Sequence, residues 1–251
     1  MELTLTLLCA LLIGLALGLF GSGGSILTVP VLLYLLHLPE KVAIATALGI
    51  VALISAVALL PYIWRGHLRW ALLAKLALPG ILGAWAGGVA SQWLDSRWQL
   101  ALLAVLMAAS AINMWRQQLW SFPLRRSWQL LLVGAGLGCV TGLIGVGGGF
   151  LIVPLLLAFT SLTVPAAIGC SLALIVLQSS SGFVSHYLHL QQLGQQPDLA
   201  LIGMIGGIGA LGSLLALSFS ERLPQMLLRR GFALLLVALA LLLMCRTLLC
   251  F

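Results

Sequence analysis

Two glycine-rich runs contain the residues best suited to chemistry in this sequence, and that chemistry is anion binding. The first run holds Gly21, Ser22, Gly23, Gly24 and Ser25, and the second holds Gly145, Gly147, Gly148 and Gly149. Glycine tolerates positive φ and leaves backbone N–H groups uncovered by side chains. We expect a helix to start just after each run, where the first N–H groups lack internal partners and the helix dipole is positive. Such a place favours a negatively charged ligand.

The two runs belong to a longer duplication. Residues 14–55 align without a gap with residues 138–179, with 17 identities in 42 pairs. Pro30 and Pro154 each follow the first glycine of their run by nine residues and act as helix breakers. A helix break at the same place in two copies is typical of a central transport site. The alternative is that the glycines only permit close helix packing.

A second set of candidate ligands lies in the apolar segments that follow the runs. It consists of Thr46, Ser55, Cys170, Ser171, Gln178 and Ser179. A buried glutamine with no partner is costly, so we predict that these side chains line a substrate path. Two alternatives remain, namely that the hydroxyls bond to their own helices or hold neighbouring helices together.

The missing residue types exclude several kinds of site. The acidic residues, all near the ends of apolar blocks, are Glu2, Glu40, Asp95, Asp198 and Glu221. A carboxylate proton relay and a metal pathway are therefore not expected. His186 and His189 lack further ligands, and neither Ser179 nor Cys170 has a visible base with an orienting partner. We predict no catalytic residues, no enzymatic activity, no metal and no cofactor.

The composition is that of a helical membrane protein. Of 251 residues, 62% are hydrophobic and 7% are charged, against about 25% charged in soluble domains. The apolar runs are about 20 residues long, which favours helices over a barrel. The five cysteines are predicted to be buried free thiols, and the first apolar run to be retained rather than cleaved. The net charge of +7 is assigned to loops that orient the chain, with no nucleic-acid partner.

The predicted fold class is an all-α polytopic bundle of two inverted repeats, each with a Gly-broken re-entrant hairpin plus three transmembrane helices. The first repeat, residues 1–120, comprises a broken block at 3–36 and helices at 42–63, 70–94 and 98–119. A linker at 121–127 precedes the second repeat, residues 128–251, with a broken block at 128–160 and helices at 165–189, 198–219 and 226–249. The broken blocks are too long for one straight crossing of a hydrocarbon core of about 30 Å.

The basic residues predict an orientation. If each broken block returns to its starting side, nine of the twelve Lys and Arg residues lie on one side of the membrane. The positive-inside rule places that side in the cytoplasm and both termini outside.

The doubled pattern resembles the sulfite exporter TauE/SafE family. The residues that carry this likeness run from Gly18 to Pro30 and from Ala43 to Leu48, with second copies from Gly142 to Pro154 and from Ala167 to Leu172. The resemblance implies a bacterial inner-membrane carrier of small sulfur-containing or organic anions. Family members often have Thr-Ser where this chain has Thr46-Ala47 and Cys170-Ser171, which leaves Ala47 and Cys170 without that hydroxyl.

The predicted function is transport of a small anion, such as a sulfur oxyanion or organosulfonate. The two glycine tips would meet near the midplane, and access would alternate between the two sides. The alternatives are an anion channel with the same site, an intramembrane enzyme and a membrane scaffold. The expected partners are the anion and the lipid bilayer, and a homodimer is left open.

Overall fold

The computed structural model describes residues 2–20, 24–116, 127–145 and 162–220. It also describes single positions at 149, 152–153, 155–156, 160, 231, 234, 237–238 and 241. Throughout these residues the regular structure is helical, with no strand, which confirms the predicted helical class.

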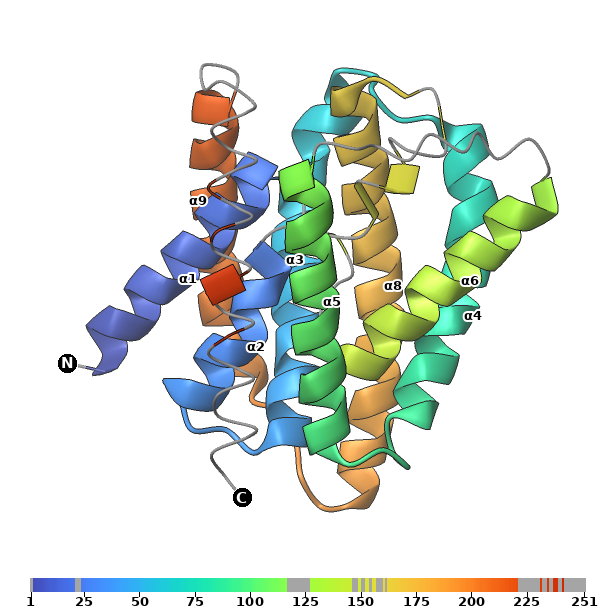
Figure 1. Cartoon of the computed structure of the whole chain (residues 1–251). Coiled ribbons are helices and arrows are strands. Elements are labelled where there is room, and N and C mark those ends of the chain that lie inside the picture. The colour runs from blue at the N-terminus through green and yellow to red at the C-terminus, as the bar shows by residue number, and fades with distance from the viewer. Residues whose placement is uncertain are drawn as a thin grey trace.

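Eight helices have defined bounds within the described residues (Figure 1). They are α1 (Glu2–Phe20), α2 (Gly24–Tyr34), α3 (Glu40–Trp64), α4 (Trp70–Ala90), α5 (Ser96–Arg116), α6 (Ser127–Ile144), α8 (Val164–Gln192) and α9 (Leu199–Ser220). Five of them, α3, α4, α5, α8 and α9, lie over the segments predicted at 42–63, 70–94, 98–119, 165–189 and 198–219. The first long block is divided into α1 and α2 on either side of residues 21–23, which lie outside the described residues, as does most of 226–249.

Local sequence signals set the helix ends. Pro39 and Thr163 precede α3 and α8, and Asp198 caps α9 by accepting hydrogen bonds from the N–H groups of Ala200 and Leu201 at 2.8 and 3.2 Å. The chain turns after α3 and α8 at glycines in the left-handed region. Their φ angles are +68° at Gly66 and +69° at Gly194.

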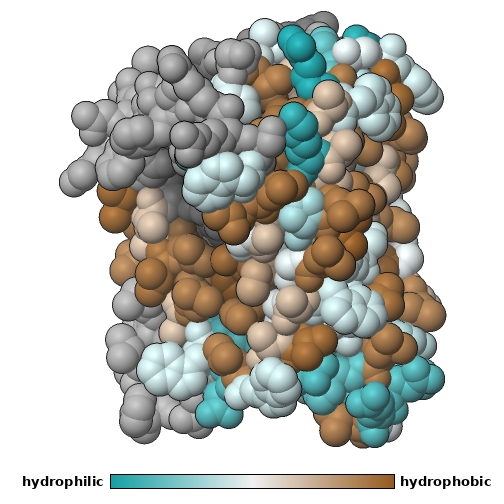
Figure 2. Space-filling view, turned by 90° about the vertical axis from the view of Figure 1, so that its right-hand side faces the viewer, coloured by the Kyte–Doolittle hydropathy of each residue, from teal (hydrophilic) through white to brown (hydrophobic). Residues whose placement is uncertain are grey.

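The surface is that of a protein that crosses a bilayer. Among the described residues, α3, α4, α8 and the segment Leu199–Ala216 of α9 are long and apolar enough to span a membrane. Figure 2 shows a broad apolar belt across the middle of one face, with hydrophilic side chains gathered towards its ends. Trp64, Trp93 and Trp98 are exposed near helix ends, where amphipathic rings favour the membrane interface.

Helices α4 and α6 meet backbone to backbone. A Cβ atom placed on Gly138 would lie 2.0 Å from the carbonyl oxygen of Gly80, and one on Gly83 would lie 2.2 Å from that of Ala135. Only glycine fits at such contacts. Gly134 and Gly142 of α6 meet Leu76 and Ala84 of α4 in the same order, so the two helices run parallel.

Helices α1 and α9 make the same kind of contact. A Cβ on Gly14 would lie 1.9 Å from the oxygen of Gly209, and one on Gly18 would lie 2.4 Å from that of Ser213. These two helices are also parallel. Helix α4 packs further on α8, and α9 packs further on α3.

Helices α3 and α8 cross at the centre of the bundle and run antiparallel (Figure 1). A Cβ on Gly169 would lie 3.1 Å from the Cβ of Tyr62, and one on Gly182 would lie 3.3 Å from Cδ1 of Leu48. Side chains therefore separate these two helices, in contrast to the backbone contacts of α4 with α6 and of α1 with α9.

We predict that Gly138→Leu destabilises the protein while Gly136→Leu does not. A side chain at position 138 must push α4 and α6 apart, and overpacking costs about 1–3 kcal/mol even where side chains can adjust. Gly136 has no atom within 4 Å of its Cβ position and is the matched control on the same helix. Thermal unfolding of the purified protein measures both, and equal midpoints would contradict the backbone contact.

Candidate functional site

The second glycine run begins at a position that only glycine can occupy. Gly145 has φ +74°, and a Cβ there would lie 2.2 Å from Cγ2 of Ile44 on α3. Its N–H donates to the carbonyl oxygen of Thr141 at 3.0 Å, which closes the last turn of α6. The end of α6 is thus pressed against α3, two residues from Thr46.

Several predicted tip residues have no structural description. Gly21, Ser22, Gly23, Gly147, Gly148 and Pro154 lie outside the described residues. Helix α2 begins at Gly24, Ser25 in its first turn is fully buried, and Pro30 lies inside the helix. Gly149 is a buried helical position. The anion cradle at the tips therefore stays a prediction.

The strongest structural signal is a set of buried polar atoms without hydrogen-bond partners. Seven such side-chain atoms occur among the described residues, and five of them lie on α3 and α8. These five are Thr46 Oγ1, Ser55 Oγ, Ser171 Oγ, Gln178 Nε2 and Ser179 Oγ. Each belongs to a side chain that is 0% exposed. All five belong to residues that the sequence had singled out as ligands.

Ser55 and Ser179 lie where α3 and α8 cross. Ser55 is seven residues from both Leu48 and Tyr62, and a spacing of two turns places all three on one face of α3. Ser179 is one turn before Gly182 on α8. We call this contact the seam, formed by Leu48, Ser55 and Tyr62 of α3 and by Gly169, Ser179 and Gly182 of α8.

The other predicted ligands do not all reach the seam. Thr46 is nine residues before Ser55, which turns it to the opposite side of α3. Cys170 Sγ accepts a hydrogen bond from the N–H of Arg69 at 3.5 Å and so has a partner at the start of α4. The structure thus favours Ser55 and Ser179 as ligands at the seam. It separates Thr46 and Cys170 from these two residues.

Gln178 faces α4 and α6. Its Oε1 accepts a hydrogen bond from Thr141 Oγ1 at 3.3 Å, and its Nε2 lies 2.5 Å from the Cβ position of Gly80. Because Thr141 occupies the oxygen, the amide N–H groups are the atoms left without a partner. The single hydroxyl proton of Thr141 is shared between this oxygen and Leu137 O, which is closer at 2.9 Å. Sequence reasoning missed Thr141, although it is the only polar side chain between Gln129 and Gly145.

The described flanks of the two glycine runs lie on opposite sides of Ser55 along the bundle. Gly145 touches Ile44, eleven residues before Ser55 on α3, which is about 16 Å along a helix. The second run therefore approaches the seam from the end where α3 begins.

The first run approaches from the other end. Gly18, three residues before it, packs on Ala216 of α9. Helix α9 runs parallel to α3 with Gly206 beside Leu53, which places Ala216 about ten residues further along. Gly145 and Gly18, the described residues at and before the two runs, thus lie on opposite sides of the level of Ser55.

A second polar cluster joins several helices at the end where α4 finishes. His186 Nε2 lies 2.8 Å from Gly142 O and 3.4 Å from Ser91 Oγ. Lys41 Nζ donates to the carbonyl oxygens of Ser91 and Leu94, and Gln99 Nε2 donates to that of Ser91. No group of three or more metal ligands occurs among the described residues. Sequence reasoning weighed His186 but missed Lys41 and Ser91, because both read as ordinary helix-end residues.

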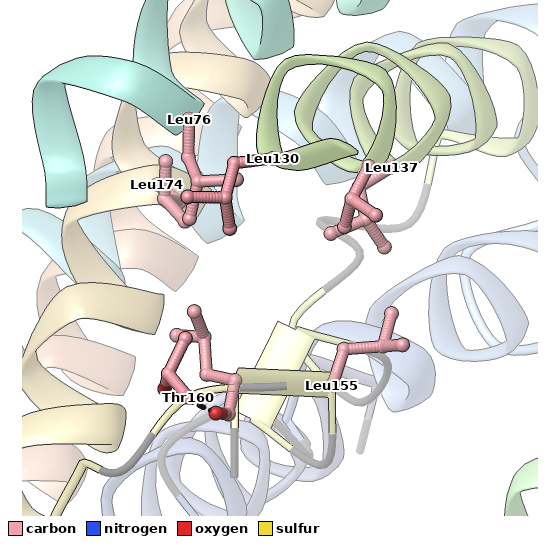
Figure 3. A pocket seen from close by; sticks show the side chains of 8 residues that line it. Leu76, Leu130, Leu137, Leu155, Thr160 and Leu174 are labelled. Atoms are coloured by element: carbon pink, nitrogen blue, oxygen red, sulfur yellow. Dashed lines mark hydrogen bonds between the residues drawn. The ribbon is translucent and has the colours of Figure 1, made fainter. Parts of the chain in front are cut away.

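An apolar crevice elsewhere offers nothing to an anion. Its lining comes from α4, α6, α8 and positions between the last two, namely Leu76, Leu130, Val133, Leu137, Leu155, Leu156, Thr160 and Leu174 (Figure 3). Thr160 is the only polar residue in this lining, and its hydroxyl donates to the carbonyl oxygen of Leu156. The seam, with its unpartnered donors, is the better candidate site.

Comparison with known proteins supports a role in membrane transport. The family model "Sulfite exporter TauE/SafE" matches residues 6–243. A probable membrane transporter protein of Xylella fastidiosa is 36% identical over 170 residues, and the match covers 64% of this chain and 65%, just under two thirds, of that relative. One from Haemophilus influenzae is 29% identical over 258 residues, covering 94% and 97% of the two chains. One from Methanocaldococcus jannaschii is 26% identical over 193 residues, covering 73% and 72%.

No solved structure matches the chain. The family match extends over nearly the whole sequence, and the relatives share the description of membrane transporter. The chain therefore belongs to the sulfite exporter TauE/SafE family of membrane proteins.

Proposed function

We propose that this protein carries a small anion across the membrane by alternating access, with the substrate passing along the seam between the two glycine tips. The observation that carries the proposal is the set of fully buried, unpartnered polar atoms on α3 and α8. An unpaired buried polar group costs about 1–3 kcal/mol. A passing ligand that accepts hydrogen bonds would offset that cost.

The available groups favour an anion over a cation. The amide N–H groups of Gln178 are donors only, and the hydroxyls of Ser55 and Ser179 are able to donate. The acidic residues of the described chain lie at or beyond helix ends, and they are Glu2, Glu40, Asp95 and Asp198. With neither a carboxylate nor a basic side chain at the seam, an anion would be held by hydrogen bonds, which suits reversible binding and release.

We further propose that the two halves are inverted repeats, each with a re-entrant hairpin. Two matching contacts support this. Gly14 against Gly209 O in α1 and α9 corresponds to Gly138 against Gly80 O in α6 and α4. The equivalent helices α3 and α8 run antiparallel, as inversion requires. The basic residues then place both termini outside, in a bacterial inner membrane.

A sulfur oxyanion or organosulfonate is the proposed substrate class, based on the family to which the chain belongs. An inside-negative potential favours anion exit by about 2.3 kcal/mol per charge per 100 mV. Export therefore needs no coupling ion. We propose a transporter rather than an enzyme. Ser91 Oγ lies 3.4 Å from His186 Nε2, but the hydroxyl donates to Gly88 O at 2.7 Å and Nε2 faces the carbonyl oxygen of Gly142 at 2.8 Å, so the pair is not arranged as a nucleophile and its base.

Flux measurements with the full chain in liposomes test this function. We expect saturable uptake and exchange of sulfite, thiosulfate or a small sulfonate, and no movement of choline or glycerol. Large unitary currents would instead indicate an anion channel. Absence of flux and of ligand-induced thermal stabilisation across the whole panel would contradict transport.

Removing the seam hydroxyls should weaken anion binding without lowering the thermal stability of the protein. In Ser55→Ala and Ser179→Ala, loss of an unpartnered buried hydroxyl should leave the thermal midpoint of the free protein unchanged or raised. The same change should weaken anion binding about tenfold, since a hydrogen bond to a charged group is worth about 1.5–3 kcal/mol. Thermal shift and flux measure the two effects.

Ser213→Ala is the matched control. Ser213 is also 0% exposed, but its hydroxyl donates to Ala210 O within its own helix at 2.8 Å. We expect unchanged flux in this variant. Normal flux in both seam variants, or an equal loss in the control, would remove the seam from the transport path.

The glycine tips are tested by Gly147→Val. A branched side chain would cover the backbone N–H groups that the proposal assigns to the anion. We expect flux to be abolished while the protein still inserts and purifies. Gly136→Val on the exposed side of α6 controls for the substitution itself, and full activity of Gly147→Val would exclude the second tip as a binding element.

A further inference from the structure

We propose that the bodies that move during transport are two helix-exchanged bundles rather than the two sequence halves. One bundle consists of α1, α2, α3 and α9, and the other of α4, α6 and α8. Each contains a helix from the opposite half of the chain, and the seam divides them. This inference rests on the proposed transport function and specifies the motion at the same site.

One pair of helices inside each bundle is too close to slide, namely α4 with α6 and α1 with α9. In the second bundle, Cβ atoms on Gly87 and Gly142 would lie 2.2 and 2.0 Å from carbonyl oxygens across the α4–α6 contact. In the first, a Cβ on Gly14 would lie 1.9 Å from the oxygen of Gly209. Helix backbones that meet this way interlock at every glycine, so a relative shift would drive backbone into backbone.

Hydrogen bonds reinforce the second bundle internally. Ser181 and Ser185 of α8 donate to the carbonyl oxygens of Ile81 and Trp85 on α4 at 2.9 and 3.4 Å. Thr141 of α6 bonds to Gln178 of α8. The Ser181 and Ser185 bonds tie α8 to a helix of the first sequence half, and a motion between sequence halves would have to break them.

The seam has neither feature. Its contacts are also looser than the side-chain contacts of α3 with α9, where Cβ atoms on Gly206 and Gly209 would lie 2.4 Å from Leu53 Cδ2 and Ile54 Cδ1. Its closest contacts are between side-chain positions, with Gly169 against Tyr62 Cβ at 3.1 Å and Gly182 against Leu48 Cδ1 at 3.3 Å. The hydroxyls of Ser55 and Ser179 have no partner there. Separation along the seam would therefore break only side-chain contacts there and would expose polar groups to water or substrate. The contact of Gly145 with Ile44, at the end of α6, would have to open as well.

The two connections between the bundles have matching hinge-like turns. Residues 65–69 link α3 to α4, and residues 193–198 link α8 to α9. Each contains a left-handed glycine, Gly66 at φ +68° and Gly194 at φ +69°, with no atom within 4 Å of its Cβ position. Loop residues of this kind absorb the backbone rotations of a hinge.

Two hydrogen bonds from Lys41 cross between the bundles. Lys41 Nζ, at the start of α3, donates to Ser91 O and to Leu94 O, the latter at 2.9 Å, beyond the end of α4. Carbonyls at a helix C-terminus favour a cation. These bonds hold the bundles together at one end, and opening on that side requires their release.

Engineered disulfides distinguish the two kinds of motion. Tyr62→Cys with Gly169→Cys crosses the seam, with Cβ positions 3.1 Å apart. Leu53→Cys with Gly206→Cys joins α3 to α9 inside one bundle, with Cβ positions 3.2 Å apart. Both pairs start on α3, both cross-link the two sequence halves, and both come close to the Cβ separation of about 3.5–4.5 Å in a disulfide.

We expect oxidation to block flux in the seam pair, with recovery on reduction, and to leave flux unchanged in the bundle pair. Each double variant is compared with its own reduced form in liposomes, and mass spectrometry verifies which cysteines are joined. The single-cysteine variants control for pairing with native cysteines. Leu48→Cys with Gly182→Cys supplies a second seam pair if the first fails to fold.

Three results would overturn the proposal. Loss of flux in both oxidised pairs would assign the motion to the sequence halves. Unchanged flux in both would show that the seam does not open. A parent chain that carries no anion would contradict the proposed function itself, and this is seen before any cysteine is introduced.

Discussion

The constraint on which the structure depends is that polar atoms inside a bilayer must find partners within the protein. The backbone meets it by forming helices. Buried hydroxyls usually meet it by bonding to carbonyls of their own helix, as Thr141 and Ser213 do. Ser55 and Ser179 do not, although both are fully buried. Both lie at the contact of α3 with α8 in the centre of the bundle, where side chains and not backbones meet.

Glycine has two separate functions in this chain. At Gly83 and Gly138 it lets two helices touch and thereby makes a rigid pair. At Gly145, Gly66 and Gly194 it permits a left-handed backbone and thereby ends a helix. The same property, absence of a side chain, produces rigidity in one place and a change of direction in the other. Rigid pairs joined by turns are what a rocking motion requires.

Much of the helical layout follows from the sequence, because apolar run length and helix-ending Pro and Gly are local properties. Helices α3, α4, α8 and α9 were predictable for that reason. The unpaired ligands at Ser55, Gln178 and Ser179 were also predictable, since polar residues deep in apolar runs need an explanation. Their partners were not, because the bond from Thr141 to Gln178 depends on how α6 and α8 pack.

The exchange of helices between halves was likewise beyond the sequence. A duplication suggests two bodies that coincide with the two copies, whereas α4 packs on α6 and α9 on α1. Two helices pack side by side where glycines on the surface of one helix meet the backbone of the other. The duplicated segment at residues 14–55 and 138–179 covers α1 and α6 but not their partners α4 and α9. The alignment of the two copies therefore could not indicate that α4 packs on α6 and α9 on α1.

The two ends of the seam are not equivalent, and this bears on the direction of transport. Lys41 bonds to the end of α4, whereas the aligned position in the second copy is Pro165, which has neither a charged side chain nor a backbone N–H. If two inverted copies made equal contacts, the state open to one side of the membrane and the state open to the other would have equal energy. In the proposed alternating-access cycle, the Lys41 bonds favour the state closed at that end and so bias the empty protein towards opening at the other. Such a bias, together with the membrane potential, would give the proposed carrier a preferred side for substrate entry.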